Sequence, residues 1–181
     1  MVAILANKHE ITLTRYLASK FMKGMGLRHG TNELSAQDLF ARRVVGFSVS
    51  DSPNSTLIAK ALQMAYQTRL KPNGVLFHSD QGTHYTSKQF AESVASCHGM
   101  VQSMSRKENC WDNAPTERFF RSFKTEWMLK GGYEDIAEAS SAITDYIWGY
   151  YQAVRPHSFN NSLTPLETER RYFNQNLLLG V

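Results

Sequence analysis

A short apolar run in the middle of the chain ends close to an acidic residue. Pro72-Asn73-Gly74 predicts a turn, and Val75-Leu76-Phe77 directly after it predicts a buried strand. Asp80 follows within the segment His78-Ser79-Asp80-Gln81-Gly82. We therefore expect the Asp80 carboxylate at the carboxyl end of a strand, where a rigid element fixes its position.

A second stretch, Trp111 to Glu117, predicts the start of a helix. Asp112 or Asn113 can accept hydrogen bonds from the first free backbone N–H groups, and Pro115 suits the first turn because its missing N–H is not needed there. Glu117 then lies about one turn into the helix. A carboxylate at a strand end and another near a helix start can converge in space.

Two converging carboxylates suggest a site for divalent metal ions. Mg²⁺ prefers oxygen ligands, and a pair of such ions stabilises the attacking and leaving oxygens of an in-line phosphoryl displacement. Each residue also has a purely structural interpretation, since Asp is common in turns and a Glu in the first helical turn suits the helix dipole. The residue types alone leave both interpretations open.

Three longer stretches carry a resemblance to a known family. They are HSDQGTHYTS at residues 78–87, QSMSRKENCWDNAPTERFFRSFKTE at 102–126 and YYQAVRPHSFNNSLTP at 150–165. They resemble the integrase-like core of insertion-sequence transposases of the second-reading-frame (OrfB) type, over roughly residues 38–173. The resemblance implies an α/β fold, namely a ribonuclease-H-like integrase core with a mixed sheet flanked by helices. It also implies a three-carboxylate (DDE) site that holds two Mg²⁺ or Mn²⁺ ions.

The resemblance assigns two of the three carboxylates. Asp80 matches the second catalytic Asp and Glu117 the catalytic Glu, both as metal ligands, with 117 − 80 − 1 = 36 residues between them, one more than we expect for the family. The family's first Asp lies on the first core strand in a Trp-x-x-Asp segment, which Gly30 to Ala36 lacks. Asp38 matches a later landmark of the family, Asp-Leu-Phe. We therefore expect an internally truncated core without the first strand, with weak or single-ion metal binding and impaired catalysis.

Basic residues near these stretches are candidates for contacts with DNA phosphates. On the predicted helix, Glu117, Arg121 and Lys124 share one side at positions i, i+4 and i+7. For each cation taken singly, a solvated surface charge is the alternative. The full set of candidates is Arg106, Lys107, Arg118, Arg121 and Lys124.

Other polar residues are expected beside the carboxylates or facing DNA. These are His78, Gln81, Trp111 and Asn113. His157, in the segment Arg155-Pro156-His157, is expected either at the DNA or metal cleft or as a packed, hydrogen-bonded histidine.

The overall charge agrees with a polyanionic partner. The 181 residues carry a formal net charge of +4, with a sequence pI of about 9.1, which is weak evidence alone. No stretch approaches the roughly 18–20 apolar residues of a membrane span, and the first five residues are too short for a signal peptide. The two cysteines, Cys97 and Cys110, favour a reduced cytoplasmic protein.

The expected partners are double-stranded DNA, as element ends and target, and a homo-oligomer or a hetero-oligomer with intact transposase. We expect no membrane association and a location at the bacterial nucleoid.

The chain is predicted to form one domain with a short arm. Residues 12–25 predict a basic amphipathic helix within a helical N-terminal remnant at 1–27, and an irregular junction is expected at 28–37. The core and the C-terminal helices are expected at 38–173, with a frayed tail at 174–181. Strands are expected at 44–50, 75–79 and 100–104, and helices at about 55–69, 87–98, 114–129, 136–154 and 165–173.

These observations predict a DNA transposase or integrase core that acts in DNA integration and transposition by metal-dependent phosphoryl transfer, with impaired catalysis. An inactive remnant that binds DNA or interferes with an intact transposase is the alternative. A third interpretation is a decayed reading frame whose product folds poorly, because a missing first strand would expose a sheet edge.

Overall fold

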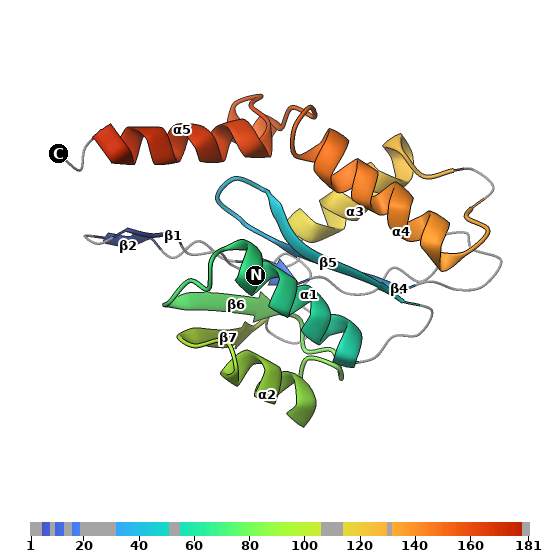
Figure 1. The fold of residues 1–181 in the computed structure, drawn as a ribbon, viewed down its shortest axis with the longest axis horizontal. Coiled ribbons are helices and arrows are strands. Elements are labelled where there is room, and N and C mark those ends of the chain that lie inside the picture. The colour runs from blue at the N-terminus through green and yellow to red at the C-terminus, as the bar shows by residue number, and fades with distance from the viewer. Residues whose placement is uncertain are drawn as a thin grey trace.

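The computed structural model describes residues 5–7, 10–12, 16–18, 32–50, 55–105, 114–129 and 132–178. Its centre is a five-stranded mixed sheet of order β5-β4-β3-β6-β7 (Figure 1). The strands are β3 (Tyr16–Ala18), β4 (Asn32–Gln37), β5 (Val44–Ser50), β6 (Val75–Ser79) and β7 (Met100–Met104). β6 runs parallel to β3 and β7, whereas β4 is antiparallel to both of its neighbours. A separate antiparallel pair is formed by β1 (Leu5–Asn7) and β2 (Glu10–Thr12).

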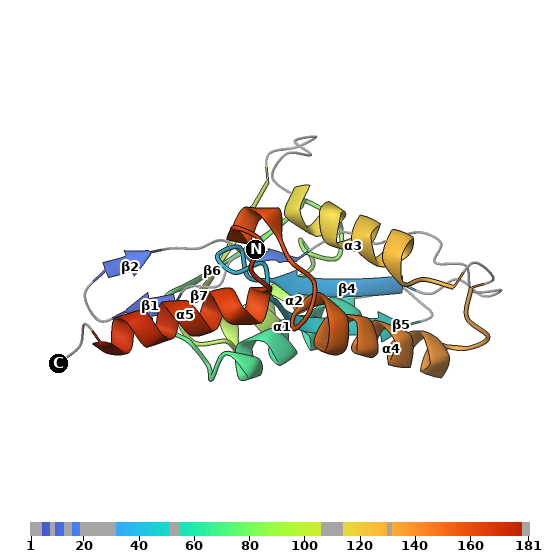
Figure 2. The same cartoon turned by 90° about the horizontal axis from the view of Figure 1, so that it is seen from above.

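Helices cover both faces of the sheet. α1 (Ser55–Thr68) shares a core with α2 (Lys88–Ala95), and α3 (Ala114–Glu126) lies on the opposite side of β4 from α1 (Figure 2). α4 (Ile136–Thr144) continues into a π-helix at Asp145–Tyr151, and a 3₁₀ turn at Ser158–Asn160 precedes α5 (Pro165–Leu178). Within the described ranges, no helix combines the length and the apolar character needed to cross a membrane.

α1 packs on the sheet through one apolar face. The buried residues of this helix recur at helical spacing and are Leu57, Ile58, Ala61, Leu62, Ala65 and Tyr66. The helix lies very close to β5 at Gly46, where a Cβ atom would be 2.2 Å from the carbonyl oxygen of Ala61. Phe77, Tyr85 and Phe90 complete this core from β6, the following loop and α2.

α3 and α4 form a second core against β5. Phe119, Phe120 and Phe123 of α3 are buried against Tyr146 and Tyr151 of the π-helix, together with Val44 of β5. The rings of Phe119 and Tyr151 meet edge to face, with centroids 4.8 Å apart, which is a favourable geometry for aromatic pairs. Burial of this face leaves the opposite side of α3 to carry the charged residues of the site.

Several predicted boundaries in the core are confirmed, and two C-terminal ones are wrong. The strands at 75–79 and 100–104 are present, and Ser87 and Asp135 cap α2 and α4 by accepting hydrogen bonds from Phe90 N and Glu138 N. The helix predicted at 136–154 is an α-helix only to Thr144, because the chain then widens into the π-helix. α5 continues to Leu178, so the frayed tail predicted from residue 174 is wrong for residues 174–178, and residues 179–181 lie outside the described ranges.

The N-terminal predictions need correction. Tyr16–Ala18 is a strand, not part of the helix predicted at 12–25 within a helical remnant, and Asn32–Gln37 is a strand, not an irregular junction. The reason is tertiary pairing, which overrides local helix propensity. β3 pairs with β4 on one side and β6 on the other, and without it both would carry unpaired backbone groups.

The expectation that the sheet lacks its first strand is therefore corrected as well. β3 fills the place between β4 and β6, although its three residues, Tyr16, Leu17 and Ala18, include no carboxylate. The sheet thus has an unbroken order of five strands, and the expected absence of the first catalytic Asp stays a prediction.

Candidate functional site

Asp80 is held at the carboxyl end of β6 by a tight network. The residue is 9% exposed, and its Oδ1 accepts a hydrogen bond of 2.8 Å from the backbone N–H of Gly82. A Cβ atom at Gly82 would come within 2.8 Å of that same Oδ1, so a glycine fits this close approach. Gln81 Nε2 donates to the carbonyl of Ser105, which ties the loop to the end of β7. The predicted position of Asp80 at a strand end is confirmed.

His78 lies two residues before Asp80 on the same strand. Its Nδ1 is 3.0 Å from Ser103 Oγ on β7, and the residue is 4% exposed. This places His78 within the sheet as a packed, hydrogen-bonded side chain.

Glu117 lies in the first turn of α3, as predicted, and is exposed. It lines a cavity of about 620 Å³ between α3, the turn that joins β4 to β5, and the segment after the π-helix. Two of the predicted DNA-contacting residues, Arg118 and Arg121, line the same cavity, whereas Lys124 lies one turn further along α3 and is exposed outside it. Arg106, Lys107, Trp111 and Asn113 lie outside the described residues.

Asp80 is not among the residues that line this cavity. α3 does lie beside β3, the strand that pairs with β6. The convergence of the Asp80 and Glu117 carboxylates on a shared metal stays a prediction.

The described residues do not supply a complete two-metal site. Among them, no group of three or more His, Cys, Asp or Glu side chains is placed to hold a metal ion. β3, which lies between β4 and β6 at the centre of the sheet, carries no carboxylate. One oxygen of Asp80 is already engaged by the Gly82 N–H. A paired-ion geometry therefore does not fit the part of the chain that the structure describes.

Asp38 does not substitute for the missing carboxylate. Leu17 of β3 is paired with both Gln37 and His78, so these two residues lie at one level of the sheet. Because β4 runs antiparallel to β6, Asp38 lies one residue from this level in one direction and Asp80 two residues in the other, which separates them by roughly 10 Å along the strands.

The side chain of Asp38 is engaged elsewhere. Its Oδ2 accepts a hydrogen bond of 2.9 Å from Arg69 Nη2, and its Oδ1 accepts one from the Phe40 N–H. Burial raises the pKa of Asp38 to about 6, against the opposing charge of Arg69. Arg69 also pairs with Glu169 of α5, which in turn pairs with Arg43. These four charges join the β4–β5 turn to α1 and α5.

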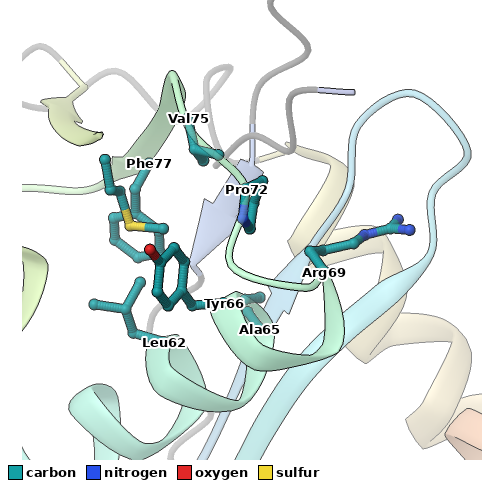
Figure 3. Close-up of a pocket in the computed structure, with 9 residues that line it drawn as sticks. Leu62, Ala65, Tyr66, Arg69, Pro72, Val75 and Phe77 are labelled. Atoms are coloured by element: carbon teal, nitrogen blue, oxygen red, sulfur yellow. The ribbon is translucent and has the colours of Figure 1, made fainter. Parts of the chain in front are cut away.

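Arg69 stands at the rim of a small apolar cavity. Its side chain points away from Leu62, Tyr66 and Phe77, which line that cavity (Figure 3). The cavity volume is about 10 Å³, which is near the minimum for a single water. The space accommodates no ligand, and the functional candidates lie at the larger cavity beside α3.

The sequence singled out only part of the larger cavity. Its further polar lining comes from Gln37, Arg42, Tyr151, Arg155 and His157. The Arg155-Pro156-His157 motif was a usable signal, whereas nothing near Gln37 or Arg42 indicated that the β4–β5 turn would meet the C-terminal motif. Asn160 Nδ2 makes that connection by donating to the carbonyl of Ala41 at 2.8 Å.

The charges of this cavity are unevenly compensated. Arg155 pairs with Glu126 through hydrogen bonds of 2.6 to 3.0 Å, which lower the pKa of Glu126 and raise that of Arg155. Burial lowers the pKa of His157 to about 4, and the positive charge of Arg155 acts in the same direction. His157 is therefore a neutral imidazole at neutral pH. Arg118 and Arg121 form no ion pair with any side chain that the structure describes.

Comparison with known proteins identifies the family. Two models described as integrase core domain match residues 33–110 and 98–165. The chain is 35% identical over 130 residues to a putative transposase, InsK, for insertion sequence element IS150 of Escherichia coli (strain K12), covering 72% of this chain and 45% of that protein. It is 33% identical over 144 residues to the transposase for insertion sequence element IS904 of Lactococcus lactis subsp. lactis (strain IL1403), covering 79% and 56%. The chain thus spans about half the length of these relatives.

Solved structures give the same fold. The catalytic core domain of BIV integrase superposes with a TM-score of 0.60 at 16% identity, covering 91% of this chain and 98% of that one. The HTLV-2 integrase catalytic core domain in complex with magnesium gives a TM-score of 0.62 at 15% identity, covering 84% and 93%. The fold is therefore the ribonuclease-H-like fold of retroviral integrase cores, as the sequence predicted. The two matched segments, which together span residues 33–165, and the transposase relatives place the chain in the integrase-core family of insertion-sequence transposases.

Proposed function

We propose that this chain is the core of a DNA transposase whose DNA-binding face is retained and whose catalysis is impaired. In its intact form such a core would cut and join double-stranded DNA in transposition and integration, by metal-dependent phosphoryl transfer. Asp80 and Glu117 are the proposed catalytic residues and metal ligands.

The observation that carries the DNA-binding part is the charge on the outer face of α3. Arg118 and Arg121 line one cavity with Glu117, and Lys124 extends the basic stripe along the exposed side of the helix. A stripe of uncompensated cations on one helix face is the electrostatic footprint of a phosphate backbone. Arg106 and Lys107, which precede α3 in the chain, are proposed to continue it.

The impairment follows from the missing third carboxylate. A pair of Mg²⁺ or Mn²⁺ ions needs a bridging ligand as well as the two terminal ones, and β3 supplies no carboxylate. Mg²⁺ can still bind through one or two carboxylates and substrate phosphates. We therefore propose weak, single-ion binding and little or no strand transfer.

A second candidate is a non-enzymatic role. The same features, a basic α3 face and an incomplete acidic set, support a chain that binds DNA or pairs with an intact transposase and so interferes with transposition. Alternatively, the chain associates with further copies of itself. Where the remnant acts by binding DNA itself, the two candidates share DNA binding and differ only in catalysis.

The test measures DNA binding and strand transfer separately. DNA carrying the element's own ends is mixed with the chain in EDTA for binding, and in Mg²⁺ or Mn²⁺ for cleavage and joining. We expect salt-sensitive binding in EDTA and no strand transfer, with activity restored when β3 is replaced by the family's first strand, which carries the missing Asp. Robust strand transfer by the unmodified chain, abolished by Glu117→Gln, would show that catalysis is intact. A folded chain that does not bind this DNA would overturn the proposal as a whole.

A further inference from the structure

Three residues that line the large cavity each have a buried polar atom without a hydrogen-bond partner among the described residues. The atoms are Oε1 of Gln37, Nη1 of Arg42 and Nε2 of His157. Gln37 is 1% exposed and His157 is 8% exposed. A buried polar group without a partner costs roughly 1–3 kcal/mol, and each such group in a native structure requires an explanation, such as a bound water or ion, local strain or a catalytic role.

These side chains are fixed by contacts with one another and with Tyr151 and Phe159, which also line the cavity. Gln37 Nε2 donates to the hydroxyl of Tyr151 at 2.8 Å and to the carbonyl of Arg42 at 2.9 Å. The guanidinium of Arg42 lies over the ring of Phe159, with its Cζ 3.7 Å from the centroid. The ring of His157 meets that of Tyr151 edge to face at 4.6 Å. The unpartnered atoms of Gln37, Arg42 and His157 are therefore held in fixed positions without a bound ligand.

The backbone around His157 has unusual local geometry. Tyr151 ends a π-helix, a conformation that is rare and frequent at functional sites. Asn161 and Ser162 both have positive φ, 53° and 64°, and the Ser162 N–H donates to the carbonyl of His157. Positive φ at a non-glycine residue is unfavourable and is retained where the surroundings impose it. The loop thus presents His157 at a defined point of the cavity.

The charge of the cavity selects an anion. Its lining includes Arg42, Arg118, Arg121 and Arg155 against the single carboxylate of Glu117. Arg155 is already compensated by Glu126, which leaves three arginines against one carboxylate, an excess of two positive charges. The amino-terminal end of α3 also borders the cavity through Ala114 and Pro115, and a helix amino terminus carries partial positive charge.

We infer that this cavity binds a phosphoryl oxyanion, held by Arg42 and Arg121 and by the Nε2 of a protonated His157. Arg42 Nη1 supplies a donor that lacks a partner. Gln37 Oε1 can only accept, so a water or a ligand hydroxyl satisfies it. The inference rests on the proposed function where the anion is a phosphodiester of DNA, and stands independently of it where the anion is free phosphate.

The hydrogen bonds of the His157 ring explain why Nε2 must be protonated when it binds an anion. The ring is hydrogen-bonded to the backbone of Tyr151, and because Nε2 has no partner, that bond uses Nδ1 as donor to a carbonyl. In the neutral ring Nε2 therefore carries a lone pair, which repels an oxyanion. The groups that face the ring are Arg155, Glu126, Arg42 and Tyr151, and an added anion shifts this balance toward the cation. Binding thus takes up a proton at Nε2.

Sulfate is the sharpest probe, because its charge stays constant between pH 5 and 7.5. The full chain is titrated with sulfate across this range by calorimetry, and the ring signals of His157 are followed by NMR. We expect sulfate affinity to rise as the pH falls, by up to about tenfold per pH unit where the free ring is neutral. We also expect the apparent pKa of His157 to increase when sulfate is present. A pH-independent affinity, an unshifted His157 or no binding overturns the inference.

Variants separate the cavity from general surface charge. His157→Phe keeps a ring against Tyr151 and should remove the pH dependence, whereas Glu117→Gln should keep it. Arg121→Gln should weaken sulfate binding roughly tenfold or more. Lys88→Gln removes one exposed charge on α2 and should leave sulfate binding unchanged. If His157→Phe does not fold, Arg121→Gln and the NMR titration of the unmodified chain still decide the matter.

A final arm distinguishes the two sources of the anion. Inorganic phosphate and a short DNA duplex in EDTA are compared for the unmodified chain and His157→Phe at pH 6. If DNA phosphates occupy the cavity, phosphate competes with the duplex and the variant weakens both. If only free phosphate enters, the variant weakens phosphate and leaves the duplex unaffected, so the cavity inference holds without its DNA form. A duplex that binds while sulfate and phosphate do not would overturn the inference and leave the proposed function standing.

Discussion

Arg69 Nη2 donates a hydrogen bond of 2.9 Å to Oδ2 of Asp38, and the side chain of Asp38 is completely buried. The pair joins the residue that follows β4 to the end of α1. Glu169 of α5 binds Arg69 from the other side and also binds Arg43. The network anchors the C-terminal helix to the sheet, and it gives Asp38 a structural role in place of a catalytic one.

Asp38→Asn should remove a distinct pH dependence of stability. Burial raises the pKa of Asp38 from 3.8 to about 6 in the folded chain, so the folded state holds this proton more tightly than the unfolded state does. The contribution of this tightly held proton to the stability of the folded chain is complete below about pH 4 and is lost as the pH rises through about 6. Urea denaturation from pH 4 to 7 should show the unmodified chain losing stability relative to Asp38→Asn. A constant difference between the two proteins across this range would contradict the assignment.

Glu169→Gln tests the bridge between α5 and the sheet. Glu169 is 4% exposed and contacts two arginines, so its removal leaves two cations without their shared partner. Breaking a buried ion pair in this way costs about 3–5 kcal/mol, measurable as a lower urea midpoint. Glu167→Gln is the matched control on the same helix, because Glu167 pairs with Arg170 and Arg171 at the surface. We expect no measurable change for that control, and equal effects of the two variants would show that α5 is not held through Glu169.

Much of the core was predictable because each element carries a complete local signal. α1 has apolar residues at helical spacing from Leu57 to Tyr66, and β6 is an apolar run that follows a Pro-Asn-Gly turn. Ser87 and Asp135 cap α2 and α4 close to the predicted starts of these two helices. The positions of Asp80 at a strand end and of Glu117 near a helix start were predicted from local signals of this kind, whereas their catalytic roles came from the family resemblance.

β4 was not predictable because its stability comes from pairing and side-chain contacts distant in sequence. Ser35 and Gln37 are polar and buried, so the strand shows no apolar alternation. The buried Gln37 is stabilised by a hydrogen bond from its Nε2 to the hydroxyl of Tyr151, a residue 114 positions away. The large cavity was missed for the same reason, since Gln37, Arg42 and His157 meet only in the folded chain.

Gly46→Ala should be strongly destabilising. A Cβ atom at this position would lie 2.2 Å from Ala61 O and 2.7 Å from Ala65 N, both backbone atoms of α1. The helix cannot remain where it is, and overpacking of this kind costs typically 1–3 kcal/mol or more. Gly149→Ala is the control, because a Cβ atom there meets nothing within 4 Å. Thermal denaturation should place Gly46→Ala well below the unmodified chain and Gly149→Ala at or above it; equal melting temperatures would contradict the close packing of β5 and α1.

The last prediction concerns the salt dependence of DNA binding. Each phosphate that the chain neutralises should contribute a slope of about −0.9 to the logarithm of the binding constant against the logarithm of salt concentration. Arg121→Ala and Lys124→Ala each remove one cation from the exposed side of α3, so each should weaken binding modestly for all DNA sequences and reduce the slope by about one. Arg121 also lines the large cavity whereas Lys124 does not, so free phosphate should compete with DNA less effectively only in Arg121→Ala. Lys88→Ala, on the exposed surface of α2, should change neither quantity.

Fluorescence anisotropy with a labelled duplex between 50 and 200 mM salt provides the measurement. Binding that is insensitive to salt, or two α3 variants indistinguishable from Lys88→Ala, would remove this helix face from the DNA interface.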